Sequence, residues 1–399
     1  MKRRVTKRVL GILLLTTMLL SGCSGNDNKN NDNPSSQSGG MSSLDESKQS
    51  QSNTNTKALK IAIVTSPTGV DDGSFNQEIY SGLQAFIKDN PDATVTPIQE
   101  SSGDPQAAVS AVADVVADYD VFVCCGYQFE GIGVLAQDNP DTKFILVDGA
   151  PMGADGNEAV CENVYGMKFA EQESGFFAGM AAALETQTGK VAVVNGIAFP
   201  SNVNYQYGFE SGVNYVNKQY QKNVELVSLP SYAGTDSNGK NVGGNYIGSF
   251  GDEAKGKVVG QALIDAGCDI LFVAAGGSGN GVFTAAKEAT GIKVIGCDVD
   301  QYDDGINGNS NIVLTSALKV MGKNVNEQLV KIRDGSFQGA NVICKADTDS
   351  TGFVKTEGRN QLSNDTIEKL DAAYDLVKAG EVIPPSSIDG QSPSNFKGL

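Results

Sequence analysis

Residues 60–88, KIAIVTSPTGVDDGSFNQEIYSGLQAFIK, join a short apolar run to a polar, glycine-containing turn and then to a helical stretch. The run Lys60–Thr65 has the length of a strand, and the stretch Asn76–Lys88 is typical of a helix. A strand, a turn and a helix in succession are the repeating unit of α/β proteins with parallel sheets. This stretch therefore predicts the fold class.

The same unit recurs along the chain. We expect strands at residues 60–65, 95–98, 121–124, 143–147, 190–194, 270–274, 293–297 and 312–316. We expect helices at residues 76–88, 105–117, 171–185, 205–219, 253–266, 281–290, 318–334 and 366–379. Several strands are continuously apolar, as strands covered on both faces are. One large doubly wound sheet is possible, but the two series 60–163 and 190–298 favour two Rossmann-like lobes with a ligand cleft between them.

The N-terminus has the features of an export signal. Five basic residues within the first eight precede the apolar run Val9–Leu20, which is short for a membrane span. The run ends in Leu20-Ser21-Gly22-Cys23, which resembles a bacterial lipobox. We expect residues 1–22 to be a signal peptide, Cys23 to be lipidated, and the polar segment 23–57 to be a disordered tether on the extracytoplasmic face of the cell membrane. The alternatives are an uncleaved anchor and a cysteine that is at this position by accident.

Composition excludes several function classes. The chain has no histidine, which rules out a Ser-His-Asp triad and every zinc site that contains histidine. Loss of the signal peptide's five positive charges, with no acidic residue beside them, takes the formal net charge from −17 to −22. Such a charge argues against nucleic acid as a partner. We expect no cofactor, no metal and no catalytic residue.

Six cysteines follow Cys23, and none of them forms a CxxC motif. Several fall in predicted strands, so we expect small buried hydrophobic side chains, with disulfides left open.

The loops after the predicted strands carry the candidate binding residues. The glycine-rich loop at 274–281 is neither GxGxxG nor a P-loop, which disfavours a nucleotide-phosphate site. Glycine there would let backbone N–H groups approach a neutral polar ligand. Asp298 and Lys319 follow two other strands and would suit the hydroxyls of a ribose. A helix cap and a solvated lysine are the alternative interpretations.

Taken together, five segments resemble one family, the basic membrane protein family of bacterial lipoproteins, which are purine-nucleoside receptors of ABC importers. The segments are 71–76, 205–209, 274–283, 296–301 and 314–319. The resemblance implies a monomeric type I periplasmic-binding fold of two α/β lobes that close on the ligand. We expect an N-terminal lobe of residues 58–163 and about 299–338, a C-terminal lobe of 164–298 and about 339–385, and a tail at 386–399.

The resemblance also implies a site in which two aromatic rings hold a purine and polar groups hold its ribose. Phe75 would be one ring and Tyr205 the second, with Phe199 as a competitor. The remaining expected ligand contacts are Asp72 and Asn76, which serve the base edge or support the loop, Gly276, Asp298 and Lys319, which bind ribose, and Tyr127 and Glu130 after the third strand. The family's acidic residue in that last loop falls on Gly131 by position, so either Glu130 substitutes for it or the base preference differs.

The expected function is therefore nucleoside capture, preferably of purine nucleosides, and delivery to an ABC permease. The alternatives are a binding protein for a sugar or other small polar solute, and a surface adhesin or sensory lipoprotein. A nucleoside hydrolase that uses Asp71, Asp72 or Asp298 is disfavoured because such enzymes tend to need a metal or a histidine. The polar stretch 231–246 has no assigned role.

Overall fold

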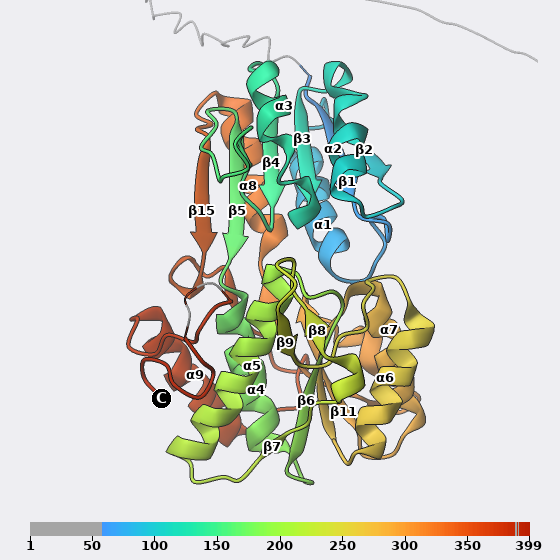
Figure 1. The fold of residues 1–399 in the computed structure, drawn as a ribbon, viewed down its shortest axis with the longest axis vertical. Helices are drawn as coiled ribbons and strands as arrows, with labels where there is room; N and C mark the ends of the chain where they lie inside the picture. The colour runs from blue at the N-terminus through green and yellow to red at the C-terminus, as the bar shows by residue number, and fades with distance from the viewer. Residues whose placement is uncertain (1–57, 388, 390) are drawn as a thin grey trace, which may run out of the picture. The chain divides into compact units, whose positions relative to one another are not determined.

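The computed structural model describes residues 58–387, 389 and 391–399 (Figure 1). The expected signal peptide, Cys23 and the whole of the expected tether lie outside these residues. The described residues belong to one compact unit, and within it two sheets confirm the predicted two-lobed α/β class. No helix of the described chain is long and apolar enough to cross a membrane.

The first sheet is wholly parallel, in the order β15-β5-β4-β3-β1-β2. Its strands are β1 Lys60–Thr65, β2 Thr94–Gln99, β3 Val121–Cys125, β4 Lys143–Val147, β5 Val164–Phe169 and β15 Ala340–Cys344. Ile61 and Ile63 face a core shared with helices α1 and α8, whereas Ala62 and Val64 face a core shared with α2 and α3. Both faces are therefore covered, which explains the continuous apolar run of β1.

The second sheet has the order β16-β14-β11-β10-β6-β7, with only the β14–β16 pair antiparallel. Its strands are β6 Lys190–Asn195, β7 Glu225–Leu226, β10 Ile270–Ala274, β11 Lys293–Asp298, β14 Val313–Lys319 and β16 Thr351–Phe353. Val191 and Val193 face a core with α4, α5 and α9, while Ala192 and Val194 face α6 and α7. Two small hairpins lie outside the sheets, β8 Gly234–Thr235 with β9 Asn241–Gly243, and β12 Ile306–Asn307 with β13 Ser310–Asn311.

The α-helices of the described chain are α1 Phe75–Asp89, α2 Pro105–Ala113, α3 Ile132–Asp138, α4 Glu171–Glu185, α5 Pro200–Gln219, α6 Glu253–Asp265, α7 Gly279–Glu288, α8 Met321–Asp334 and α9 Asn364–Lys378. Helix α5 starts five residues earlier than expected, at Pro200, where proline is favoured because the first turn needs no N–H donor. Tyr205 consequently lies inside the helix rather than at its start.

The expected lobe boundaries differ from the observed pairing. Strands β5 and β15 belong to the first sheet rather than to the second lobe, and β14 pairs with β11 in the second sheet rather than lying in the first lobe. The N-terminal lobe is thus residues 58–169 and 320–345, and the C-terminal lobe is residues 170–319 and 346–399. The sequence did not indicate β5 and β15 as strands because they are partly exposed and lack a continuous apolar run.

Two further expectations can be compared with the described chain. The segment expected to be a tail packs on the C-terminal lobe, where the buried ring of Phe396 lies 6.2 Å from that of Phe176. The six described cysteines are all buried and unpaired, as small hydrophobic side chains would be.

Candidate functional site

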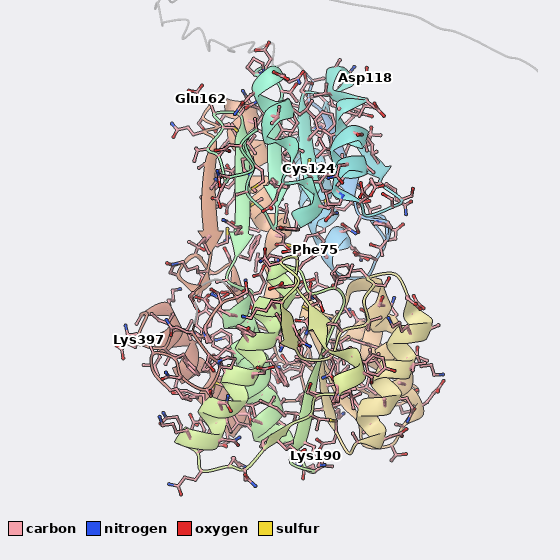
Figure 2. The ribbon with its side chains drawn as sticks, viewed as in Figure 1. Phe75, Asp118, Cys124, Glu162, Lys190 and Lys397 are labelled. Atoms are coloured by element: carbon pink, nitrogen blue, oxygen red, sulfur yellow. The ribbon has the colours of Figure 1, made fainter. Side chains whose placement is uncertain are left out.

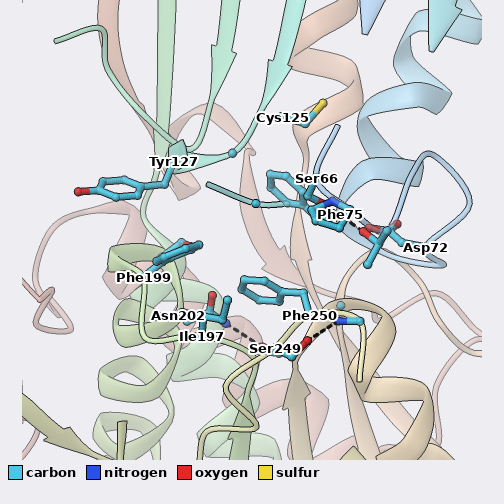
Figure 3. A pocket seen from close by; sticks show the side chains of 18 of the residues that line it. Ser66, Asp72, Phe75, Cys125, Tyr127, Ile197, Phe199, Asn202, Ser249 and Phe250 are labelled. Carbon is cyan, nitrogen blue, oxygen red and sulfur yellow. Dashed lines mark hydrogen bonds between the residues drawn. The ribbon is translucent and has the colours of Figure 1, made fainter. Parts of the chain in front are cut away.

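A cavity of about 750 Å³ lies between the lobes, at the carboxyl ends of the strands (Figure 3). The N-terminal lobe contributes the loops after β1, β2, β3 and β4. The C-terminal lobe contributes those after β6, β10, β11 and β14, together with the segment 248–254 that leads into α6. Figure 2 shows Phe75 at this junction of the two lobes. Ligands of open α/β sheets bind at this edge because post-strand loops converge there. The volume suits a small molecule of nucleoside or disaccharide size.

Most of the predicted residues meet at this cavity. Those that line it are Asp72, Phe75, Tyr127, Phe199, Tyr205, Gly276, Asp298 and Lys319. Asn76 and Glu130 do not line it.

The aromatic residue that sequence reasoning missed is Phe250, whose ring faces the cavity (Figure 3). Its ring lies against Gly196, where an added Cβ would come 2.2 Å from the Phe250 Cε1 atom. Gly276 is also adjacent, because a Cβ there would lie 3.5 Å from Phe250 Cδ1. Gly196 therefore makes room for the ring, whereas a Cβ at Gly276 would make only an ordinary contact with it. The ring of Phe199 is 6.0 Å from that of Phe250, at an angle of 43°.

Both the ring and the hydroxyl of Tyr205 make contacts within the C-terminal lobe. Its side chain is only 3% exposed, and its ring packs edge-on against Phe272 at 5.6 Å. Its hydroxyl donates a hydrogen bond of 2.8 Å to Asp298 Oδ1. Tyr205 thus supports a carboxylate of the cavity, and Phe250 and Phe199 are the C-terminal-lobe rings available to stack on a ligand.

Asp72 and Asn76 organise the loop that carries Phe75. The Asp72 carboxylate accepts backbone N–H bonds from Ser74, Asn76 and Gln77 at 3.0–3.1 Å, which caps the start of α1. The Asn76 amide donates to Ser66, Thr68 and Asp72. Burial raises the pKa of Asp72, and its backbone donors oppose that rise. The loop-supporting interpretation of Asn76 therefore fits the structure.

Asp298 ends β11 with a left-handed φ of 69°, a strained value for a residue other than glycine. Its other carboxylate oxygen accepts a bond of 3.1 Å from the Ser74 hydroxyl, across the cleft. It is not a helix cap, because α7 has already ended at Glu288 and the next α-helix, α8, begins only at Met321.

Lys319 is buried rather than solvated. Its ammonium pairs with Asp148 and, at 2.9 Å, with Glu171, and its side chain is 2% exposed. Burial raises the pKa of Asp148, and the Lys319 charge acts against that rise. The sequence interpretation missed both carboxylates, because a lone acidic residue at a strand end or helix start is most often a cap.

Glu130 lies behind the cavity wall. Its carboxylate accepts the backbone N–H of Ala150 at 3.2 Å. Burial raises the pKa of Glu130 to about 7. A direct contact between Glu130 and a ligand, in place of the family's acidic residue, therefore has no support in this geometry.

The charge on the wall is strongly acidic. Among the described lining residues, Lys319 is the single cation, against Asp72, Asp148, Asp252, Glu253 and Asp298. Like charges repel strongly where water is partly excluded, so such a wall favours neutral polar ligands over phosphorylated ones.

Comparison with known proteins agrees with this geometry. The family model described as "ABC transporter substrate-binding protein PnrA-like", Bmp, matches residues 59–233 and 232–386. The chain is 30% identical to the ABC transporter nucleoside-binding protein BmpA of Lactococcus lactis over 364 residues, covering 86% of this chain and 88% of that one. It is 27% identical to basic membrane protein A of Borreliella burgdorferi, covering 82% and 88%.

A solved ABC-transporter solute-binding protein from Aeropyrum pernix K1 superposes with a TM-score of 0.67 at 21% identity, covering 83% of this chain and 95% of that one. This likeness supports the two-lobed fold. The matching family model and the Lactococcus relative are both described as substrate-binding or nucleoside-binding proteins of ABC transporters, which confirms the prediction that the chain is not an enzyme.

Proposed function

Because the chain belongs to the Bmp family of PnrA-like ABC-transporter substrate-binding proteins, we propose that it captures nucleosides, preferably purine nucleosides, in the interlobe cavity and delivers them to an ABC permease. The observation that carries this proposal is one cavity that offers aromatic rings from both lobes beside a buried carboxylate and ammonium. Rings hold a flat base, whereas the charged pair holds vicinal hydroxyls.

In this arrangement the base lies between Phe75 of the N-terminal lobe and Phe250 of the C-terminal lobe. An aromatic contact contributes about 0.5–1.5 kcal/mol beyond the burial of area, so two rings give a substantial share of the affinity. Phe250 replaces Tyr205 as the second ring, since the Tyr205 edge and hydroxyl are already engaged. Asp298 and Lys319 bind the ribose, and the acidic wall disfavours nucleotides.

The anchoring is part of the same proposal. Lipidation at Cys23 would attach a monomeric binding protein to the outer side of the cell membrane, beside the permease, with residues 24–57 as the tether. Mass spectrometry of the purified protein would show a diacylated or triacylated N-terminal peptide beginning at Cys23. A peptide that retains residues 1–22 would contradict the lipidation.

A ligand screen tests the nucleoside site. Ligands that bind only the folded state raise the unfolding temperature by mass action. We expect inosine, guanosine and adenosine to raise the Tm of the purified protein, with smaller shifts for pyrimidine nucleosides and none for the matching 5′-monophosphates. Shifts with hexoses alone would favour a sugar-binding protein, and no shift with any of these solutes would favour an adhesin or sensor.

A further inference from the structure

Asp148 is a buried carboxylate on the cavity wall to which the proposed function gives no role. It follows β4 directly, and its side chain is 7% exposed. Its φ of 65° lies in the left-handed region, which is strained for a residue other than glycine. The strand pairing sustains this strain, because the Asp148 N–H donates to the Met167 carbonyl at 2.8 Å. A strained backbone at a residue of the cavity wall indicates that the Asp148 side chain has a function there.

Its partner, Lys319, links the two lobes. The Lys319 ammonium pairs with Asp148 of the N-terminal lobe and with Glu171, the first residue of α4 in the C-terminal lobe. Glu171 is itself fixed by a 3.0 Å hydrogen bond from Asn204. Lys319 stands at the end of β14, where the chain crosses from one lobe to the other.

The same ammonium also orients an aromatic residue of the site. The Lys319 nitrogen lies 5.3 Å from the ring centroid of Phe75 and 5.3 Å from that of Phe169. A cation at this distance from a ring face is attracted to it. One buried nitrogen therefore contacts a ring proposed to stack on the base and also borders the cavity.

The Lys319 ammonium has more N–H donors than its two ion pairs require. An ammonium has three N–H donors and no acceptor. Counting one donor for each of the two ion pairs leaves one donor on a residue that lines the cavity. Without Asp148 the ammonium would keep one ion pair, with Glu171 of the C-terminal lobe, and only the weaker contacts with the rings of Phe75 and Phe169, so it could turn away from the ligand.

We propose that Asp148 is a positioning residue for ligand binding, which holds the Lys319 ammonium between the lobes so that its third N–H meets a ligand hydroxyl only when the lobes are closed. The inference rests on the proposed nucleoside function. It assigns to this carboxylate the discrimination between a ligand that carries ribose hydroxyls and one that lacks them.

The test compares inosine with hypoxanthine, the same base without ribose, by titration calorimetry on the full chain. Asp148→Asn keeps the shape of the side chain and removes its charge. We expect the affinity for inosine to fall by about tenfold or more, as it does when a charged hydrogen bond is lost. We expect the affinity for hypoxanthine to fall by less than about threefold. Small-angle scattering should show that inosine compacts the wild-type protein more than the variant.

Glu173→Gln is the matched control. Glu173 is also buried at the start of α4, but it bonds to the Ala346 N–H and the Thr351 hydroxyl and does not line the cavity. We expect Glu173→Gln to leave the affinities for inosine and for hypoxanthine unchanged. If Asp148→Asn fails to fold, Glu171→Gln removes the other partner of Lys319 and should show the same split.

Equal losses for inosine and hypoxanthine, or inosine binding as tight as that of the wild type, would overturn the positioning role. A wild-type protein that binds no nucleoside would overturn the proposed function as well, so the two failures are distinguishable.

Discussion

Phe250 reaches the cavity because Gly196, which has no Cβ, leaves space for its ring. Its loop follows the β8–β9 hairpin and not a strand of the six-stranded sheet. Its sequence position therefore does not predict that it lies at the carboxyl edge of the sheet. The predicted strand-end residues Phe75, Asp298 and Lys319 do line the cavity, because parallel strands bring their carboxyl ends to one edge. The sequence therefore predicts which residues lie at the carboxyl ends of the strands, but it does not predict which loops contact one another.

Phe250→Ala should weaken inosine and hypoxanthine alike, by about fivefold or more, because the ring would stack on the base that both share. Titration calorimetry with both ligands measures this. Tyr205→Phe is the comparison, since it removes only the hydroxyl that donates to Asp298, and should weaken inosine while sparing hypoxanthine. Hypoxanthine binding that survives Phe250→Ala unchanged would place the base elsewhere.

Glu130 makes stability depend on pH. Burial raises its pKa from 4.5 to about 7, so between these values the folded state keeps a proton that the unfolded state releases. The unfolding free energy therefore falls as pH rises from 4.5 to 7. Glu130→Gln stays neutral and can still accept the Ala150 N–H. It should be more stable than wild type at pH 8 by on the order of 1–3 kcal/mol, with the advantage shrinking toward pH 4.5.

Urea unfolding of both proteins at several pH values measures that difference. A stability gap that does not change with pH would show that the folded protein does not hold Glu130 protonated.

Helices α4 and α5 approach each other backbone to backbone through glycines. A Cβ added at Gly212 would lie 2.1 Å from the Phe176 carbonyl oxygen, and one added at Gly179 would lie 2.1 Å from that of Phe209. This close packing sets the position of the N-terminal end of α5, which carries Tyr205 and follows Phe199 directly. The two helices are thus a support for the C-terminal-lobe wall of the cavity.

Gly212→Ala should lower the unfolding free energy by about 1–3 kcal/mol, because overpacking forces backbone shifts in a dense core. Urea denaturation gives the value. Gly352→Ala is the matched change, since the new Cβ would approach Tyr374 Cε2 only to 3.5 Å, an ordinary contact. A Gly212→Ala protein as stable as Gly352→Ala would mean that the helices can separate freely.

Elements with strong apolar runs were predictable, and edge elements were not. Strands such as β3 and β10 are buried on both faces and were expected nearly at their observed bounds. The strands β5 and β15 alternate or stay partly exposed, so their runs are weak, yet their pairing decides where one lobe ends. The lobe boundaries were wrong for this reason, although the number of lobes was right.

At the scale of the whole molecule, the lobes touch on two sides of the cavity. On one side Ser74 donates to Asp298, and Gln301 donates to the Gly73 carbonyl at 3.3 Å. On the other side the rings of Tyr127 and Phe199 meet at 5.5 Å, at an angle of 36°. Figure 3 shows the Tyr127 hydroxyl directed away from the cavity, while the Phe199 ring also neighbours that of Phe250 at 6.0 Å. The aromatic pair is therefore a contact that must separate when the lobes open.

Tyr127→Ala should raise the dissociation rate of inosine by about 2- to 10-fold, because an aromatic pair contributes about 0.5–1.5 kcal/mol to the closed state. Stopped-flow displacement of a fluorescent nucleoside measures the rate. Tyr127→Phe keeps the ring and should release inosine at the wild-type rate, since the hydroxyl points away from the cavity. If Tyr127→Phe released inosine as fast as Tyr127→Ala, the hydroxyl rather than the ring would hold the lobes together, and the Tyr127–Phe199 contact would have no part in closure.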